Sequence, residues 1–131
     1  MKKEIAKNDY YEIYVDQTKN RYYFLLVGLW QYPSEIPDYL DDIKKTADSL
    51  SPGFTGLADT RKIKMPAQKV MELHAKGFQI FGKAGLRKVA FVYDKTIIKI
   101  ASEKVSKNGG VDEQLRLFKD MNEAEDWLDG K

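Results

Sequence analysis

The hydrophobic pattern of this chain changes period directly after Trp30, and that change limits the possible folds more than any other feature of the sequence. Before it, residues 10–16 and 21–28 are rich in β-branched and aromatic side chains and predict two strands, joined by a polar hairpin loop. After it, apolar residues recur three and four positions apart over 36–50, which predicts a helix with one apolar face. The chain therefore starts as an antiparallel hairpin and then continues with helices.

Strand and helix patterns alternate along the rest of the chain. Strands are predicted over 54–59, 87–93 and 115–119, and helices over 66–84, 95–107 and from Asp120 onward. The segment 95–107 has both strand and helix character, and the Lys-Asn-Gly-Gly stop that follows it favours the helix. Ser34 is the expected N-cap of the first helix, and Pro66 is the expected first residue of the second.

The resulting order is β-β-α-β-α-β-α-β-α, which predicts an α/β fold. We expect a mixed five-stranded sheet with helices mainly on one face. Residues 10–131 are expected to form a single domain, preceded by an N-terminal segment of residues 1–9, and 131 residues is an ordinary length for one domain.

The composition narrows the possible functions. The chain has 22 Lys and Arg residues and 20 Asp and Glu residues, which gives a net charge of +2. Such a small positive charge does not indicate a nucleic-acid partner. The absence of cysteine excludes disulfides and thiolate metal sites, and the single histidine leaves few metal ligands, so we expect no metal and no cofactor. Because no apolar run approaches ~18 residues and the first residues lack the apolar stretch of a signal peptide, we expect no integral membrane insertion and a cytoplasmic location.

The closing segment Leu-Arg-Leu-Phe-Lys-Asp-Met-Asn-Glu-Ala-Glu-Asp-Trp-Leu, residues 115–128, combines a strand, an acidic turn and a helix that ends in Trp-Leu. Together with the order of elements, it resembles the STAS superfamily, which contains the anti-sigma-factor antagonists and their SpoIIAA-like, lipid-transfer-like relatives. The resemblance extends from Tyr10 to Leu128. It implies a STAS-like fold and a regulatory or binding role.

Phosphoregulated members of that superfamily carry an Asp-Ser-Ser/Thr-Gly motif where the third strand meets the next helix. The corresponding stretch of this chain begins Asp59-Thr60-Arg61, and the Ser-Gly core of the motif is missing. The chain is therefore more similar to the diverged SpoIIAA-like branch than to the partner-switching phosphoproteins.

The basic segment 60–65 is the first candidate site. It is expected to be a loop that follows a strand, at the edge where ligands of open α/β sheets bind, and it precedes a helix whose first N–H groups attract anions. A solvated basic loop without a ligand is the simpler alternative. The residues predicted to bind an anionic or apolar ligand are Asp59, Thr60, Arg61, Lys62 and Lys64.

Aromatic residues in and after the hairpin form a second candidate, an interaction surface. If helices cover one face of the sheet only, a row of aromatic side chains remains open for a protein partner, a ligand or a second copy of the chain. The alternative is that these rings pack inside the protein. The residues concerned are Tyr10, Tyr14, Tyr22, Phe24 and Trp30.

Two features of the helix predicted over 66–84 bear on function. Phe78, Ile80 and Phe81, with two internal glycines, are suited to wall a hydrophobic cavity, although such stripes are more often ordinary core. His74 shares this apolar face, and a hydrogen-bonded histidine at the margin of the core is its simplest interpretation.

No catalytic residue is predicted, because no nucleophile or carboxylate is spaced to form a recognisable motif with His74. The leading hypothesis is a non-enzymatic, cytoplasmic regulatory or binding module. The alternatives are a small enzyme with a pocket near Asp59 and His74, and a purely structural homodimer.

Overall fold

The structure is a computed structural model that describes residues 2–131. Met1, the first residue of the predicted N-terminal segment, lies outside the described residues. The elements follow in the order β1 (Lys3–Lys7), β2 (Tyr11–Asp16), β3 (Arg21–Gly28), a 3₁₀ turn η1 (Pro33–Glu35), α1 (Tyr39–Asp48), β4 (Thr55–Ile63), α2 (Gln68–Ala84), β5 (Lys88–Val92), α3 (Thr96–Asn108), β6 (Leu115–Phe118) and α4 (Met121–Leu128).

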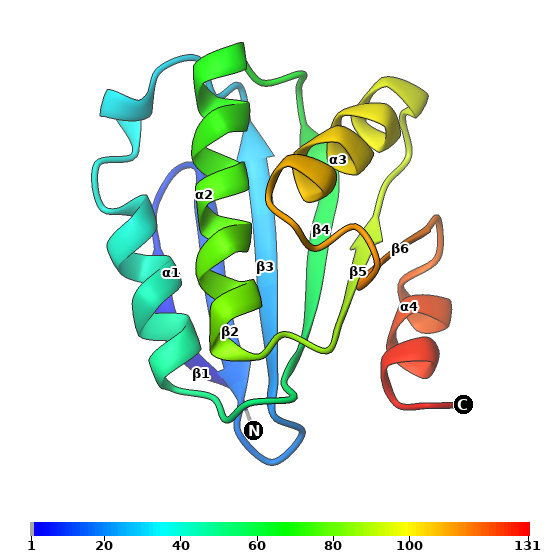
Figure 1. Ribbon diagram of the computed structural model, residues 1–131. Helices are drawn as coiled ribbons and strands as arrows, with labels where there is room; N and C mark the ends of the chain where they lie inside the picture. Colours follow the sequence, from blue (N-terminus) through cyan, green and yellow to red (C-terminus); the bar gives the residue numbers. More distant parts are fainter. Residues whose placement is uncertain (1) are drawn as a thin grey trace.

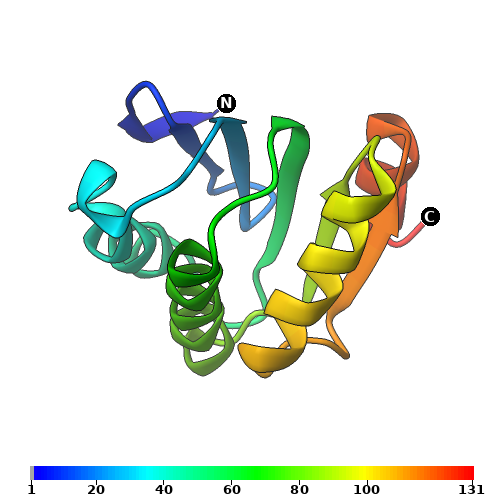
Figure 2. The same cartoon turned by 90° about the horizontal axis from the view of Figure 1, so that it is seen from above.

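The strands lie side by side in the order in which they occur in the sequence, β1 to β6. β1, β2 and β3 pair antiparallel, and β3 to β6 pair parallel. Because each parallel crossover moves in the same direction along the sheet and such crossovers are right-handed, α1, α2 and α3 all fall on one face (Figures 1 and 2). In the part of the chain that the structure describes, α4 is the last element, and it folds back onto the opposite face.

The sheet has six strands, and five were predicted. The additional strand is β1, which pairs with the outer side of β2 and has a register irregularity between Glu4 and Ala6. Its sequence Lys-Glu-Ile-Ala-Lys is short and charged, as is typical of protected edge strands. Because three of its five residues are charged, the strand lacks the alternation of apolar residues by which strands are predicted.

Two predicted helix starts are wrong. Ser34 lies inside η1, and α1 begins at Tyr39, because Pro37 disfavours a helical backbone at Ile36, which has φ −132° and ψ 61°. Pro66 precedes α2, which begins at Gln68. The helix favoured over 95–107 is confirmed as α3, and the terminal helix is confirmed as α4.

The two faces of the sheet carry separate cores. The larger core lies beneath α1, α2 and α3 and contains Tyr11, Ile13 and Val15, which alternate along one face of β2. The smaller core lies beneath α4 and is formed by Leu57, Ala90, Val92, Ala124 and Leu128. α4 covers the β4–β6 side of its face, so the prediction of helices mainly on one face is confirmed.

A buried arginine attaches α4 to the sheet. Arg21, at the start of β3, is 3% exposed, and its guanidinium pairs with Glu125 and Asp129 of the terminal helix and its cap. Its Nε also donates to the hydroxyl of Thr55, 2.8 Å away on β4. Lys19 reaches the same two carboxylates at 3.8 Å from the hairpin loop.

Candidate ligand-binding cavity

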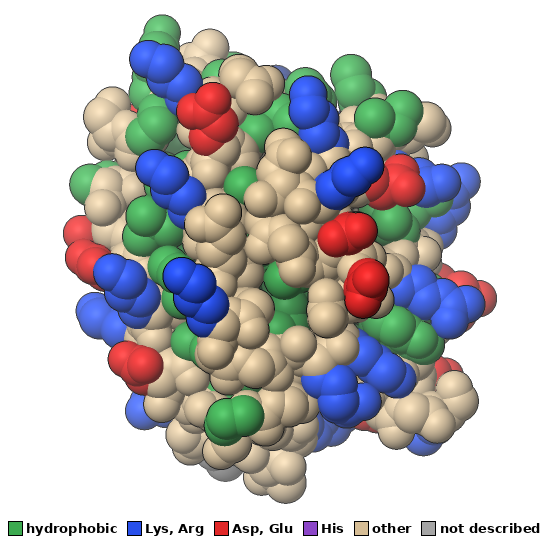
Figure 3. All heavy atoms as spheres, in the orientation of Figure 1, with side chains coloured by type: hydrophobic (Ala, Val, Ile, Leu, Met, Phe, Trp, Pro, Cys, Tyr) green, Lys and Arg blue, Asp and Glu red, His purple; other side chains and the backbone are tan. Residues whose placement is uncertain are grey.

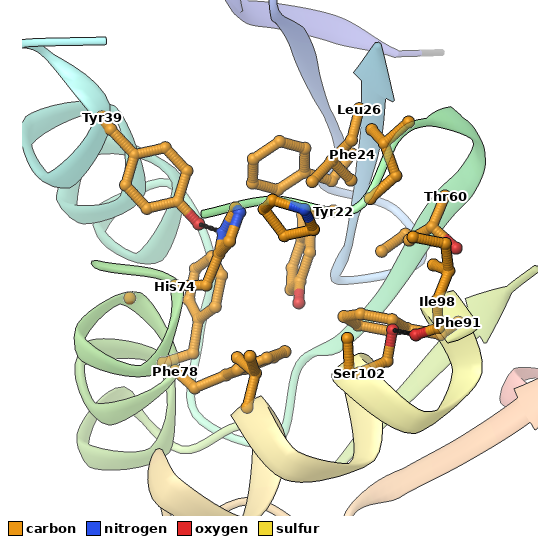
Figure 4. Close-up of a pocket in the computed structure, with 17 residues that line it drawn as sticks. Tyr22, Phe24, Leu26, Tyr39, Thr60, His74, Phe78, Phe91, Ile98 and Ser102 are labelled. Atoms are coloured by element: carbon orange, nitrogen blue, oxygen red, sulfur yellow. Dashed lines mark hydrogen bonds between the residues drawn. The ribbon is translucent and has the colours of Figure 1, made fainter. Parts of the chain in front are cut away.

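An apolar cavity of about 60 Å³ lies between helices α2 and α3 and the face of the sheet that they cover (Figure 4). Its floor comes from β3, β4 and β5, and its walls come from the helices. The residues that line it are Tyr22, Phe24, Leu26, Tyr39, Ala58, Thr60, Ile63, Pro66, His74, Gly77, Phe78, Phe81, Phe91, Ile98, Ala101, Ser102 and Val105.

Simple periodicities of the chain place these side chains together. The alternation of β3 sends Tyr22 and Phe24 to the face that carries α2 and α3. On α2, the glycine at Gly77 leaves room for α1, because a Cβ there would lie 3.3 Å from the ring of Tyr39. α3 contributes residues three and four positions apart, which form the apolar face of a helix.

The polar groups of the cavity wall are few, and most are bonded to the protein. The hydroxyl of Thr60 donates to the carbonyl oxygen of Val92 at 2.9 Å. The hydroxyl of Ser102 donates to the carbonyl oxygen of Ile98 at 2.8 Å (Figure 4). Among the described lining residues there is no Asp, Glu, Lys or Arg. The wall is therefore suited to an apolar, uncharged ligand.

His74 lies at the margin of the cavity. Its Nδ1 is 2.8 Å from the hydroxyl oxygen of Tyr39, and its ring packs against Trp30 at a centroid distance of 5.0 Å. Burial lowers the pKa of His74 to about 4, so the imidazole is neutral at pH 7. The prediction of a hydrogen-bonded histidine at the core margin is confirmed.

The predicted anion site is divided between the two faces of the sheet. The segment predicted as a loop continues β4 as far as Ile63, and strand alternation turns Thr60 toward the cavity and Asp59 and Arg61 to the opposite face. Lys62 and Lys64 are exposed beyond them. Thr60 is 1% exposed, so its hydroxyl is closed to a kinase in this structure.

The charge of Arg61 is already paired. Its Nε and Nη2 donate to the two carboxylate oxygens of Asp59, each at 2.9 Å. Burial opposes ionisation of Asp59, but the hydrogen bonds and charge of Arg61 outweigh it and hold the pKa of the carboxyl below its usual value. Asp59 and His74 lie on opposite faces of the sheet, so they do not share the pocket that the enzyme alternative required.

The predicted aromatic surface is also divided. Tyr22, Phe24 and Trp30 are 1%, 6% and 2% exposed, because they point beneath the three helices, and they cannot present an open surface. Tyr10 is half-buried, and its hydroxyl donates to Glu35 at 2.9 Å. Tyr14 is half-buried on the other face, where its hydroxyl bonds to Glu12.

The sequence did not indicate the wall that α3 contributes. Ile98, Ala101 and Val105 recur three and four positions apart along α3, but the sequence predicted only that residues 95–107 form a helix. The suggestion that the 66–84 helix walls a hydrophobic cavity agrees with the lining by Gly77, Phe78 and Phe81, whereas Ile80 is not a lining residue.

No protein-family model matches this chain, and no curated protein matches it by sequence. A solved structure of an uncharacterised protein of the DUF3478 family, with a SpoIIAA-like fold, from Shewanella loihica PV-4 is similar to it. The TM-score is 0.67, the match covers 94% of this chain and 97% of that chain, and 16% of the residues are identical. The predicted SpoIIAA-like fold is therefore confirmed.

The structure also bears on membranes and metals. Over residues 2–131, no helix has both the length and the apolar character needed to cross a bilayer. In the same part of the chain, no cluster of three or more His, Cys, Asp or Glu side chains is placed to hold a metal ion.

Proposed function

We propose that this protein is a non-enzymatic binding module that takes a small apolar ligand into the cavity between the sheet, α2 and α3. The observation that carries this proposal is the wall itself, which is almost entirely aliphatic and aromatic and is formed by elements far apart in the sequence. Ligand sites are typically concave, largely apolar and provided with a few polar groups.

The location of the cavity supports the same function. Thr60 and Ile63 line it near the carboxyl end of β4, the side of an open α/β sheet at which ligands bind. On the surface between α2 and α3, few charged side chains are visible, and most Lys, Arg, Asp and Glu side chains lie around it (Figure 3). An apolar molecule approaching this surface would displace little bound water from charged groups.

The size of the cavity adds a condition. About 60 Å³ is less than the ~150 Å³ of an apolar cavity that holds benzene. A ligand of that size therefore requires the lining side chains of α2 and α3 to move apart when it binds. Regulation of a protein partner by such a movement, and a cytoplasmic location, remain hypotheses that accompany this proposal.

A titration with ethylbenzene and n-octane, followed by calorimetry and by thermal unfolding, tests the proposal. We expect saturable binding and a rise in Tm for the natural sequence. Ala101→Phe, which fills the cavity from α3, should weaken binding about tenfold or more. Lys104→Phe is the matched control, because residue 104 is exposed on the same helix.

Overpacking can unfold a protein, so Ala101→Val provides a milder second variant that should weaken binding less than phenylalanine does. Absence of saturable binding to the natural sequence would overturn the proposal. Equal binding by the natural sequence and a folded Ala101→Phe variant would also overturn it, since the ligand would then lie elsewhere.

A further inference from the structure

The hydroxyl group of Tyr22 differs from the other polar groups of the cavity. The side chain is 1% exposed, and Figure 4 shows its oxygen pointing into the middle of the cavity. No hydrogen bond joins that oxygen to any group of residues 2–131, and because no fully enclosed polar side-chain atom there is left unbonded, the oxygen is open to the space of the cavity. Polar groups inside proteins are nearly always bonded, so a hydroxyl that faces an apolar cavity without a protein partner is available to bond a molecule placed there.

The packing around Tyr22 fixes where this hydroxyl lies. The ring stacks on Phe81 at a centroid distance of 4.5 Å and an interplanar angle of 18°. On the other side it lies against Gly56, where a Cβ would be only 2.1 Å from Cζ of the tyrosine. Phenylalanine would make the same ring contacts without burying an oxygen, so packing alone does not account for a tyrosine.

Burial raises the pKa of Tyr22, so its hydroxyl keeps its proton at neutral pH and is able to donate a hydrogen bond. The hydroxyl protons of Thr60 and Ser102 are already used on backbone carbonyls. Since no formal charge lines the wall at pH 7, an anionic ligand would lose its hydration without gaining a counter-ion.

We propose that the ligand of this cavity is a neutral, largely apolar molecule with one hydrogen-bond-accepting oxygen, such as a carbonyl, which accepts the proton of the Tyr22 hydroxyl. This inference rests on the proposed function and names the chemical class of its ligand. The basic segment predicted an anionic or apolar ligand. For this cavity we infer an uncharged ligand.

Two probes of the same shape test the inference. Ethylbenzene and acetophenone differ at one carbon, which carries an oxygen only in the ketone, and benzoate supplies an anionic aromatic ligand. Calorimetric titration of the natural sequence should show acetophenone binding about two- to tenfold more tightly than ethylbenzene, as one hydrogen bond provides. Benzoate should bind more weakly than either.

Tyr22→Phe should abolish the preference for acetophenone without weakening ethylbenzene, because the ring contacts with Phe81 and Gly56 remain. Tyr14→Phe is the matched control, since it removes a hydroxyl on the opposite face of the sheet and should leave all three affinities unchanged.

The outcomes separate this inference from the proposed function. If ethylbenzene and acetophenone bind equally to the natural sequence, or the preference survives in Tyr22→Phe, the ligand class is wrong and the apolar site stands. Tighter binding of benzoate than of acetophenone would also overturn the ligand class. If none of the probes binds, the proposed function fails and this inference fails with it.

Discussion

The hydroxyl oxygen of Tyr39 and Nδ1 of His74 lie 2.8 Å apart, and this hydrogen bond joins α1 to α2 at the margin of the cavity. Tyr39 is 4% exposed, and burial raises the pKa of its hydroxyl, so it remains protonated across the neutral range. The contact therefore depends on the protonation of His74, which burial keeps neutral.

Lowering the pH should destabilise the protein through His74. Its pKa is lowered from 6.5 to about 4 on folding, so the unfolded chain binds the proton first. The stabilisation is complete above pH 6.5 and is lost as the pH falls through about 4. Relative to His74→Gln, the natural sequence should lose up to about 3 kcal/mol of unfolding free energy between neutral pH and pH 4.

Urea denaturation at a series of pH values measures this difference. The glutamine variant retains a polar side chain near Tyr39 but does not titrate, and the carboxylates common to both proteins cancel in the comparison. Parallel curves for the two proteins across the whole range would contradict the prediction.

Arg21→Met should loosen the terminal helix. The substitution keeps the buried aliphatic stem but removes the pairs with Glu125 and Asp129, and we expect a loss of about 1–3 kcal/mol. The loss stays at this level because the two carboxylates are each 26% exposed, so water reaches them. Chemical denaturation measures the stability, and amide hydrogen exchange locates the change in α4.

Lys19→Ala is the matched control for Arg21, since its ammonium group reaches the same carboxylates from a side chain that is 43% exposed. Exposed ion pairs contribute little, and we expect a change below about 0.5 kcal/mol. A larger effect for Lys19 than for Arg21 would reverse our assignment of the buried arginine as the anchor of α4.

Gly56→Ala should be strongly destabilising, because its methyl group would lie 2.1 Å from Cζ of Tyr22, whose ring is held by the stack on Phe81. Overpacking of this kind costs about 1–3 kcal/mol. Gly82→Ala provides a comparison within α2, where the new methyl group would meet a single side-chain atom of Val111 at 3.3 Å. Thermal unfolding should show a large drop in Tm for residue 56 and little change for residue 82.

Phosphate and nucleotides should not stabilise the protein through Arg61 and Lys64. The guanidinium of Arg61 is held by Asp59, and an added anion would have to displace that carboxylate. In thermal unfolding with and without these anions, the natural sequence and the Arg61→Ala/Lys64→Ala variant should therefore shift equally. Stabilisation confined to the natural sequence would restore the basic segment as an anion site.

Local patterns in the sequence predicted those elements whose boundaries are set by neighbouring residues. The hairpin, α3 and α4 belong to this group, and Asp120 caps α4 by accepting from the N–H of Asn122 at 2.7 Å. The extension of β4 through Arg61 and Lys62 was not predicted, because two adjacent cations resemble a loop. The strand tolerates them since Arg61 is paired with Asp59 and Lys62 is exposed.

The candidate site could be predicted only in part, because it depends on which face of the sheet each helix covers. Alternation separates Tyr22 and Phe24 from Tyr23, but it does not reveal which row lies beneath three helices and which beneath one. The open hydroxyl of Tyr22 depends further on the stacking of Phe81, a residue 59 positions later in the chain. Such contacts follow from the assembled tertiary structure.

The match between strand order and chain order has a consequence for how the protein is made. Each strand from β2 onward is laid beside the one that precedes it in the sequence, so the sheet can lengthen from its N-terminal edge as the polypeptide leaves the ribosome. The antiparallel pairings of β1, β2 and β3 close short loops and favour rapid folding, whereas each parallel pairing from β3 onward closes a longer loop that contains a helix and forms more slowly. The pairs of Arg21 with Glu125 and Asp129 then join the C-terminal helix to the first half of the chain.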